Sequence, residues 1–136
     1  MSGRSDLANA PPFAVVLSAD DGMNKRIAYW LSTARHAAAT ARSGYAARAL
    51  IVDGTTRLLV TDRLLPPWPG LDTIFRLRQS VADLKVAFLG DGVPDNQRLA
   101  LSAGADVILP YPLRRAHVLD AAVMADPAYG MLACAS

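Results

Sequence analysis

The stretch Leu58-Leu59-Val60-Thr61-Asp62 places a carboxylate directly after a short apolar run. A run of this length and composition is typical of a strand buried on both faces of a sheet. The proline-rich segment Pro66-Pro67-Trp68-Pro69-Gly70 follows it and turns the chain. Because ligands of open α/β sheets bind outside the carboxyl ends of the strands, Asp62 is the first candidate site residue.

Apolar strand-like runs and helical patterns alternate along the rest of the chain. The expected strands cover residues 13–18, 37–41, 57–62, 85–89 and 105–109. The expected helices cover residues 23–33 (with Asp21 as the N-cap), 43–52, 71–81, 94–103 and 114–124. Five strands alternating with helices predict an α/β fold with a parallel sheet covered on both faces.

Composition predicts one domain and argues against nucleic acid and membranes as partners. The chain has 136 residues, 52% of them hydrophobic, which is enough for one sizeable core. We expect a flexible leader over residues 1–12, the domain over 13–125 and a tail over 126–136. A net charge of +2 without a basic stripe argues against direct nucleic-acid binding, and no apolar run reaches the roughly 18 residues of a membrane span. The single cysteine, Cys134, excludes an internal disulfide and fits a cytoplasmic protein.

Four segments, taken in order, carry a resemblance to a known family. They are Ala19-Asp20-Asp21-Gly22-Met23-Asn24, residues 60–70 around Asp62, Phe88-Leu89-Gly90-Asp91, and residues 103–112 (AGADVILPYP). Together they resemble the receiver domain of bacterial two-component response regulators, over about residues 13 to 124. The resemblance implies a flavodoxin-like (βα)5 fold, a doubly wound parallel five-stranded sheet with strand order 2-1-3-4-5.

The resemblance also implies roles for individual residues. Asp62 matches the aspartate that takes a phosphoryl group from a histidine kinase. Mg²⁺ would be held by Asp20, Asp62 and the carbonyl of Leu64, since this cation prefers oxygen ligands. Catalysis of phosphoryl transfer at such a site is mostly positioning and stabilisation of negative charge.

Several positions depart from the family pattern. The first acidic position falls on Ala19, although a shift of one residue would restore an Asp20-Asp21 pair. The hydroxyl position is Gly90, which has no side chain. Next to it, Asp91 is interpreted as a turn residue rather than a ligand.

Two further positions, those of the family's lysine and of its aromatic switch residue, depart from the pattern as well. The lysine position is Tyr111, which is neutral near pH 7 and is interpreted as packing into the space that the lysine leaves. The aromatic switch position is Ile108, which has neither a hydroxyl nor a ring. We therefore expect Mg²⁺ to bind weakly or not at all. We also expect an interruption of the family's usual relay from the phosphorylated aspartate to the outer face formed by the fourth and fifth helices and the fifth strand.

These residues predict an atypical receiver domain, a pseudo-receiver that acts mainly through protein–protein contacts and is not an enzyme. The expected partner is a histidine kinase, a phosphotransfer protein, an output protein or a second copy of the chain. The expected contact face comprises Arg98, Ile108, Arg114 and His117; the first helix, with Asn24 and Arg26, is the alternative face. Two other functions remain open: a single-domain response regulator phosphorylated on Asp62, and a small-molecule-sensing flavodoxin-like domain.

Overall fold

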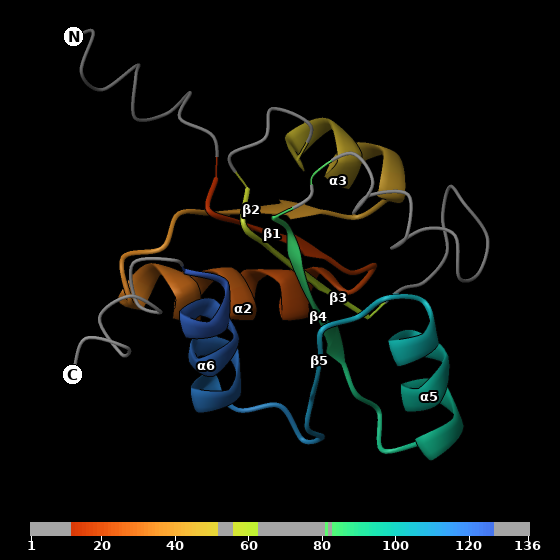
Figure 1. Ribbon diagram of the computed structural model, residues 1–136. Helices are drawn as coiled ribbons and strands as arrows, with labels where there is room; N and C mark the ends of the chain where they lie inside the picture. Colours follow the sequence, from red (N-terminus) through yellow and green to blue (C-terminus); the bar gives the residue numbers. More distant parts are fainter. Residues whose placement is uncertain (1–11, 52–55, 63–80, 82, 127–136) are drawn as a thin grey trace, which may run out of the picture.

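Strands and helices alternate through the part of the chain that the computed structural model describes, residues 12–51, 56–62, 81 and 83–126 (Figure 1). The elements are β1 (Ala14–Leu17), α2 (Asp21–Thr33), β2 (Ala38–Ala41), α3 (Gly44–Ile51), β3 (Leu58–Thr61), β4 (Lys85–Leu89), α5 (Pro94–Ser102), β5 (Val107–Leu109) and α6 (Arg115–Ala125). The expected leader, the expected helix 71–81 and the expected tail fall almost wholly outside the described residues. Among the helices described, none is long and apolar enough to cross a membrane.

The five strands form one parallel sheet in the order β2-β1-β3-β4-β5, as predicted. In the register between neighbouring strands, Leu17 pairs with Thr61, and Thr61 pairs with Phe88. Because the strands are parallel, the residues that follow β1, β3 and β4 all emerge at the same edge of the sheet. This edge is where the predicted site lies.

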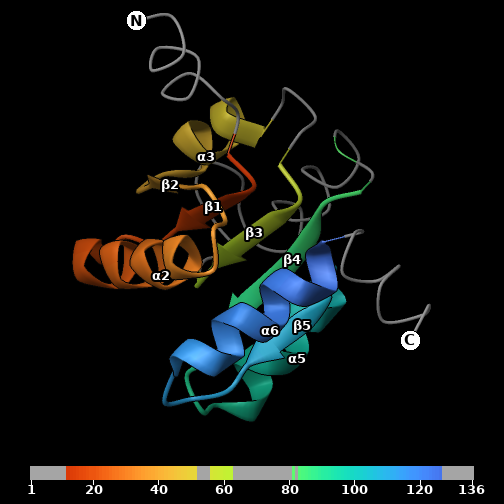
Figure 2. The same cartoon turned by 90° about the vertical axis from the view of Figure 1, so that its left-hand side faces the viewer.

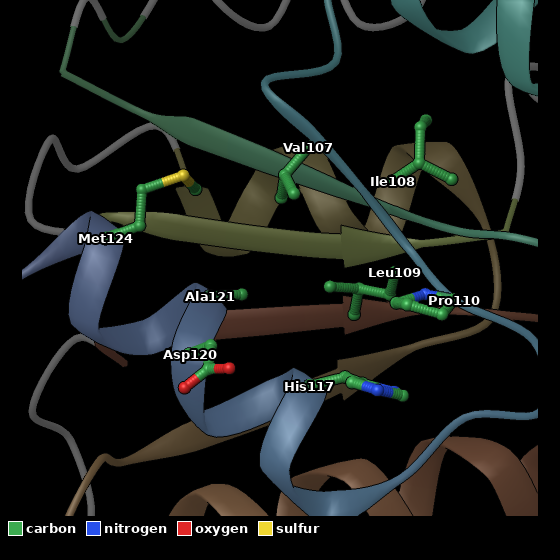
Figure 3. A pocket seen from close by; sticks show the side chains of 8 residues that line it. All are labelled: Val107, Ile108, Leu109, Pro110, His117, Asp120, Ala121 and Met124. Atoms are coloured by element: carbon green, nitrogen blue, oxygen red, sulfur yellow. The ribbon is translucent and has the colours of Figure 1, made fainter.

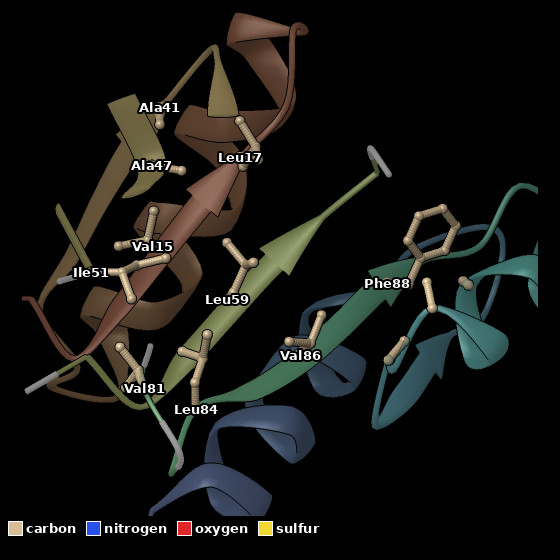
Figure 4. Packing of buried hydrophobic residues seen from close by; sticks show 13 residues of the cluster. Val15, Leu17, Ala41, Ala47, Ile51, Leu59, Val81, Leu84, Val86 and Phe88 are labelled. Carbon is tan, nitrogen blue, oxygen red and sulfur yellow. The ribbon is translucent and has the colours of Figure 1, made fainter. Parts of the chain in front are cut away.

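Two apolar layers cover the two faces of the sheet, because successive strand residues point to opposite sides. One layer packs strand residues such as Val15, Leu59 and Val86 with residues of α3 and α5 (Figure 4). The other packs residues such as Val16 and Val60 with α2 and α6, which lie next to each other in Figure 2. The sheet is therefore doubly wound, and its strands are continuously apolar because both faces are buried.

The segment between α5 and β5 shows how the sequence builds this arrangement. Gly104 has a φ of 110°, a backbone conformation that favours glycine, and Ala105 N–H then donates to the carbonyl of Ala100 at 3.0 Å. Asp106 N–H donates to Val86 O at 2.8 Å, and Asp106 Oδ2 accepts from Val86 N–H at 2.7 Å. This reciprocal pair fixes the start of β4 against the entry to β5.

The start of α2 corrects one expectation. The N-cap is Asp20, whose Oδ1 accepts from Met23 N–H at 3.2 Å, and Asp21 is the first helical residue. The expected N-cap, Asp21, was wrong by one position because either aspartate can cap a helix. The structure gives that role to the residue with extended backbone, at φ −86° and ψ 106°.

Candidate functional site

The carboxyl edge of the sheet brings Asp62 next to the residue that follows β1. Since Leu17 and Thr61 are register partners, Ser18 and Asp62 emerge side by side from the ends of two adjacent strands. The Ser18 hydroxyl donates to Asp62 Oδ2 at 2.8 Å. Ser18 is fully buried, whereas Asp62 is exposed, so the bond joins the core to the carboxylate that the solvent reaches.

Ser18 is a site residue that the sequence analysis missed. It is a polar residue at the end of an apolar strand, and this position is the sequence signal that marks it. Its contact with Asp62 depends on the register of β1 against β3, and no local pattern in the sequence gives that register.

Asp20, the predicted second acidic residue, connects to the same network through its backbone. Asp20 N–H donates to the Ser18 hydroxyl oxygen at 3.0 Å, while its side chain caps α2. Asp20 and Asp62 each use one carboxylate oxygen in a hydrogen bond to the protein. The third predicted ligand, the Leu64 carbonyl, lies outside the described residues.

The described residues offer few oxygens for a divalent cation. Among them, no three His, Cys, Asp or Glu side chains gather where they could hold a metal ion. Ala19, at the first acidic position, has no side-chain oxygen. Within the described residues, the predicted donors are two exposed carboxylates, each with one oxygen already hydrogen-bonded, which fits a resident Mg²⁺ poorly.

The other two acidic residues considered for the site, Asp21 and Asp91, have partners of their own. Asp21 pairs with Lys25 one helical turn later, with 3.0 Å between Oδ2 and Nζ. Asp91 accepts from Val93 N–H at 2.9 Å and from the Asn96 side-chain amide at 2.6 Å. These two hydrogen bonds, chiefly the one from Val93, lower the pKa of Asp91 below its ordinary value of 3.8. Asp91 thus lies in a turn that starts α5, as interpreted from the sequence.

The position of the family's hydroxyl is closed by the neighbouring strand. A Cβ placed on Gly90 would come within 2.6 Å of the Leu109 carbonyl oxygen and 3.2 Å of Ile108 Cγ2. Gly90 N–H donates to that same carbonyl at 2.9 Å, which holds β4 and β5 at this separation. The glycine is therefore required by the close approach of the two strands, and a serine or threonine would push β5 away.

Tyr111 does not pack into the site. Its side chain is 69% exposed, so the expected packing role in place of a lysine is wrong. The ring lies near Gly92, where a Cβ would be 3.9 Å from Tyr111 Cδ1. The chain bends at Tyr111, between Pro110 and Pro112, and leaves the phenol exposed to solvent.

A groove of about 300 Å³ runs between β5 and α6, and Asp62 is not among the residues that line it (Figure 3). Eight residues line it: Val107, Ile108, Leu109, Pro110, His117, Asp120, Ala121 and Met124. Figure 3 shows the Ile108 side chain pointing away from α6, in agreement with its packing against the α3 and α5 layer. The groove is mostly apolar, with His117 and Asp120 as its charged or titratable members.

The predicted contact face is assembled only in part. Ile108 and His117 line the groove, whereas Arg98 lies on the outer side of α5 in an ion pair with Asp95. Arg114 precedes α6, and its N–H donates to His117 Nδ1 at 3.2 Å.

The alternative face on α2 needs a correction. Asn24 is fully buried: its amide donates to Ser18 O at 2.8 Å and to Ala41 O at 3.2 Å, so it cannot meet a partner. Arg26, the other residue expected on this face, is exposed, and so is Tyr29.

Comparison with known proteins supports the receiver fold. No family model and no curated protein matches the sequence. Among solved structures, the chain is similar to a response regulator receiver domain from Bermanella marisrubri, with 26% identity, a TM-score of 0.68, and 79% of this chain and 91% of that chain covered. It is also similar to the receiver domain of NtrX from Brucella abortus, with 23% identity, a TM-score of 0.71 and coverage of 82% and 96%.

A receiver domain protein from Clostridium thermocellum matches with 21% identity, a TM-score of 0.73 and coverage of 88% and 97%. These likenesses span nearly the whole length of each receiver domain and most of this chain. The chain thus has the fold of a response regulator receiver domain, as the four sequence segments predicted.

Proposed function

We propose that this receiver domain works in two-component signal transduction as a protein-interaction module whose phosphorylation machinery is degraded. The observation that carries the proposal is the closed position at Gly90. A receiver that has merely lost a hydroxyl would keep space for one, whereas here the Leu109 carbonyl lies 2.6 Å from where the Cβ would be. The strand pair has adapted to the absence of that side chain.

Two further features support the same conclusion. A phosphoryl group on Asp62 would add negative charge at an edge where an exposed tyrosine, Tyr111, stands at the position of the family's lysine. Ile108, at the switch position, is partly buried, packs against the core layer, and has neither a ring nor a hydroxyl. A modification switches a protein only when it biases an element with two arrangements, and in this proposal Ile108 is not such an element.

The groove between β5 and α6 is the surface best suited to a protein partner. Its lining is mostly apolar, and Met124, 40% exposed at its rim, is a side chain that adapts to different partners. The partner is a histidine kinase, a phosphotransfer protein, an output protein or a second copy of the chain. Mg²⁺ binds weakly or not at all in this proposal, and the domain turns over no substrate.

The experiment is intact-mass measurement after incubation with Mg²⁺ and a small phosphodonor, with Asp62→Asn as the matched control. The proposal predicts no mass gain in either protein while both stay folded. A gain of one phosphoryl group that Asp62→Asn abolishes would overturn the proposal in favour of a working single-domain response regulator.

A further inference from the structure

Ser18 makes four hydrogen bonds at the carboxyl edge of the sheet. Its N–H donates to Ala41 O at 3.2 Å, and its carbonyl accepts from the Asn24 amide at 2.8 Å. Its hydroxyl accepts from Asp20 N–H at 3.0 Å and donates to Asp62 at 2.8 Å. Every polar group of this buried residue therefore has a partner, and those partners lie on three different segments of the chain.

The contacts of Ser18 continue into the first turn of α2. Asp20, which is held through its N–H by the Ser18 hydroxyl, caps the helix by accepting from Met23 N–H. Asn24, which holds the Ser18 carbonyl, is itself a residue of that first turn and is fully buried. Both the hydroxyl and the carbonyl of Ser18 are thus linked to the first turn of α2.

A hydroxyl has one proton, so its donor bond fixes where its lone pairs point. While Ser18 donates to Asp62, the hydroxyl oxygen is free to accept from Asp20 N–H. If Asp62 no longer accepts, the hydroxyl proton turns to another acceptor or to water, and the geometry at Asp20 N–H changes with it. A change in hydrogen bonding at Asp62 would then be transmitted to the N-cap of α2 through the Ser18 hydroxyl oxygen.

We propose that Ser18 is a positioning residue that couples Asp62 to the first turn of α2. The coupling runs through β1, on the opposite side of Asp62 from the closed pair of β4 and β5. It rests on the proposed function and deepens that function, because it makes α2, with exposed Arg26 and 67% exposed Tyr29, the surface that responds when the hydrogen bonding of the Asp62 carboxylate changes, without phosphorylation.

The test is a double-mutant cycle read by amide NMR shifts and hydrogen exchange in the full chain, with Ser18→Ala, Asp62→Ala and the double variant. Asp62→Ala alone should shift the amides of Asp20 and Met23 and speed the exchange of Met23 about two- to tenfold, the equivalent of one modest hydrogen bond. In the Ser18→Ala background, the same Asp62→Ala change should have no further effect on these amides.

Two controls separate coupling from general loosening. Ser43→Ala removes a hydroxyl that accepts from Ala46 N–H at the start of α3, so it should affect α3 and leave α2 unchanged. Ser18→Thr, which keeps a hydroxyl, should restore the response to Asp62→Ala.

The proposal is overturned if Asp62→Ala leaves Asp20 and Met23 unchanged, or if its effect on them persists without Ser18. Neither outcome depends on whether Asp62 accepts a phosphoryl group. Failure of this inference is therefore distinguishable from failure of the proposed function, which is read by the mass measurement.

Discussion

Gly90 is the residue whose environment decides how the site is interpreted. Its conformation is unexceptional, but the carbonyl of Leu109 occupies the space that any Cβ would need. A sequence alone shows that the hydroxyl is missing, and the structure adds that it cannot simply be put back.

Gly90→Thr should destabilise the protein by about 1–3 kcal/mol, the usual cost of overpacking a well-packed site. Gly90→Ala should lose a comparable amount, since the clash begins at the first side-chain carbon. Chemical denaturation of the three proteins measures both changes. A Gly90→Thr protein as stable as the parent would show that β5 yields easily and that the position is not closed.

Asp91 should make stability depend on pH in acid. Its folded pKa lies below 3.8, so its carboxylate stabilises the fold above the unfolded value, and the contribution is lost as the pH falls through the folded pKa. The parent should therefore be more stable than Asp91→Ala at neutral pH, and this advantage should shrink as the carboxylate is protonated in acid. Asp91→Asn keeps an oxygen for Val93 N–H without titrating, so its difference from Asp91→Ala should not vary with pH. A parent advantage over Asp91→Ala that did not shrink at the acid end would contradict this assignment.

At the scale of elements, the ends of helices and strands are held by polar contacts that apolar periodicity does not reveal. The pattern of apolar residues predicts where α2 and β1 lie. The tie between them is Asn24, which was expected on a contact surface and is buried against Ser18 and Ala41. Its Oδ1 is buried without a hydrogen-bond partner among the described residues.

Asn24→Ala should cost about 1–3 kcal/mol, because the Ser18 carbonyl would be left buried without its donor. Asn96→Ala is the matched control: Asn96 is exposed on α5, and its loss should cost about 0.5 kcal/mol or less. Equal effects of the two substitutions on the free energy of unfolding would show that Asn24 does not tie α2 to the sheet.

Gly104→Ala should cost about 1–3 kcal/mol, because a φ of 110° strains any residue with a Cβ. The cost should appear in thermal or chemical unfolding without any change in the amide shifts at Asp62. Ser102→Ala, at the exposed last residue of α5, should change stability little. A tolerated Gly104→Ala would mean that the turn into β5 readily adopts another conformation.

At the scale of the whole molecule, the fold was predictable and the site only partly so. Residues 85–89 were expected as a strand and form β4, and even the alanine-rich segment around Ala38–Ala41 forms the predicted strand β2. Buried parallel strands are continuously apolar, so the sequence marks them directly. Order and layers then follow from the alternation of strands and helices, together with the resemblance.

The site depends on contacts between segments far apart in the chain, and these the sequence could not supply. Ser18 meets Asp62 across 44 positions through strand register, and Gly90 meets Leu109 through the spacing of two strands. Tyr111 was expected inside and lies outside, because the backbone direction after β5 decides where it points. Asp62 itself was placed correctly at the end of β3, since strand ends are visible in the apolar pattern.

Whether Asp62 controls the groove between β5 and α6 is tested by amide-shift mapping of the whole chain with Mg²⁺ and beryllofluoride, a phosphoryl mimic, beside Asp62→Asn. If the phosphorylation machinery is degraded as proposed, Ile108, Leu109 and His117, which line the groove, keep their shifts whether or not the mimic is added. Mimic-dependent shifts at these three residues that Asp62→Asn removes would contradict it, because they would show that Asp62 still controls the surface proposed to bind the partner.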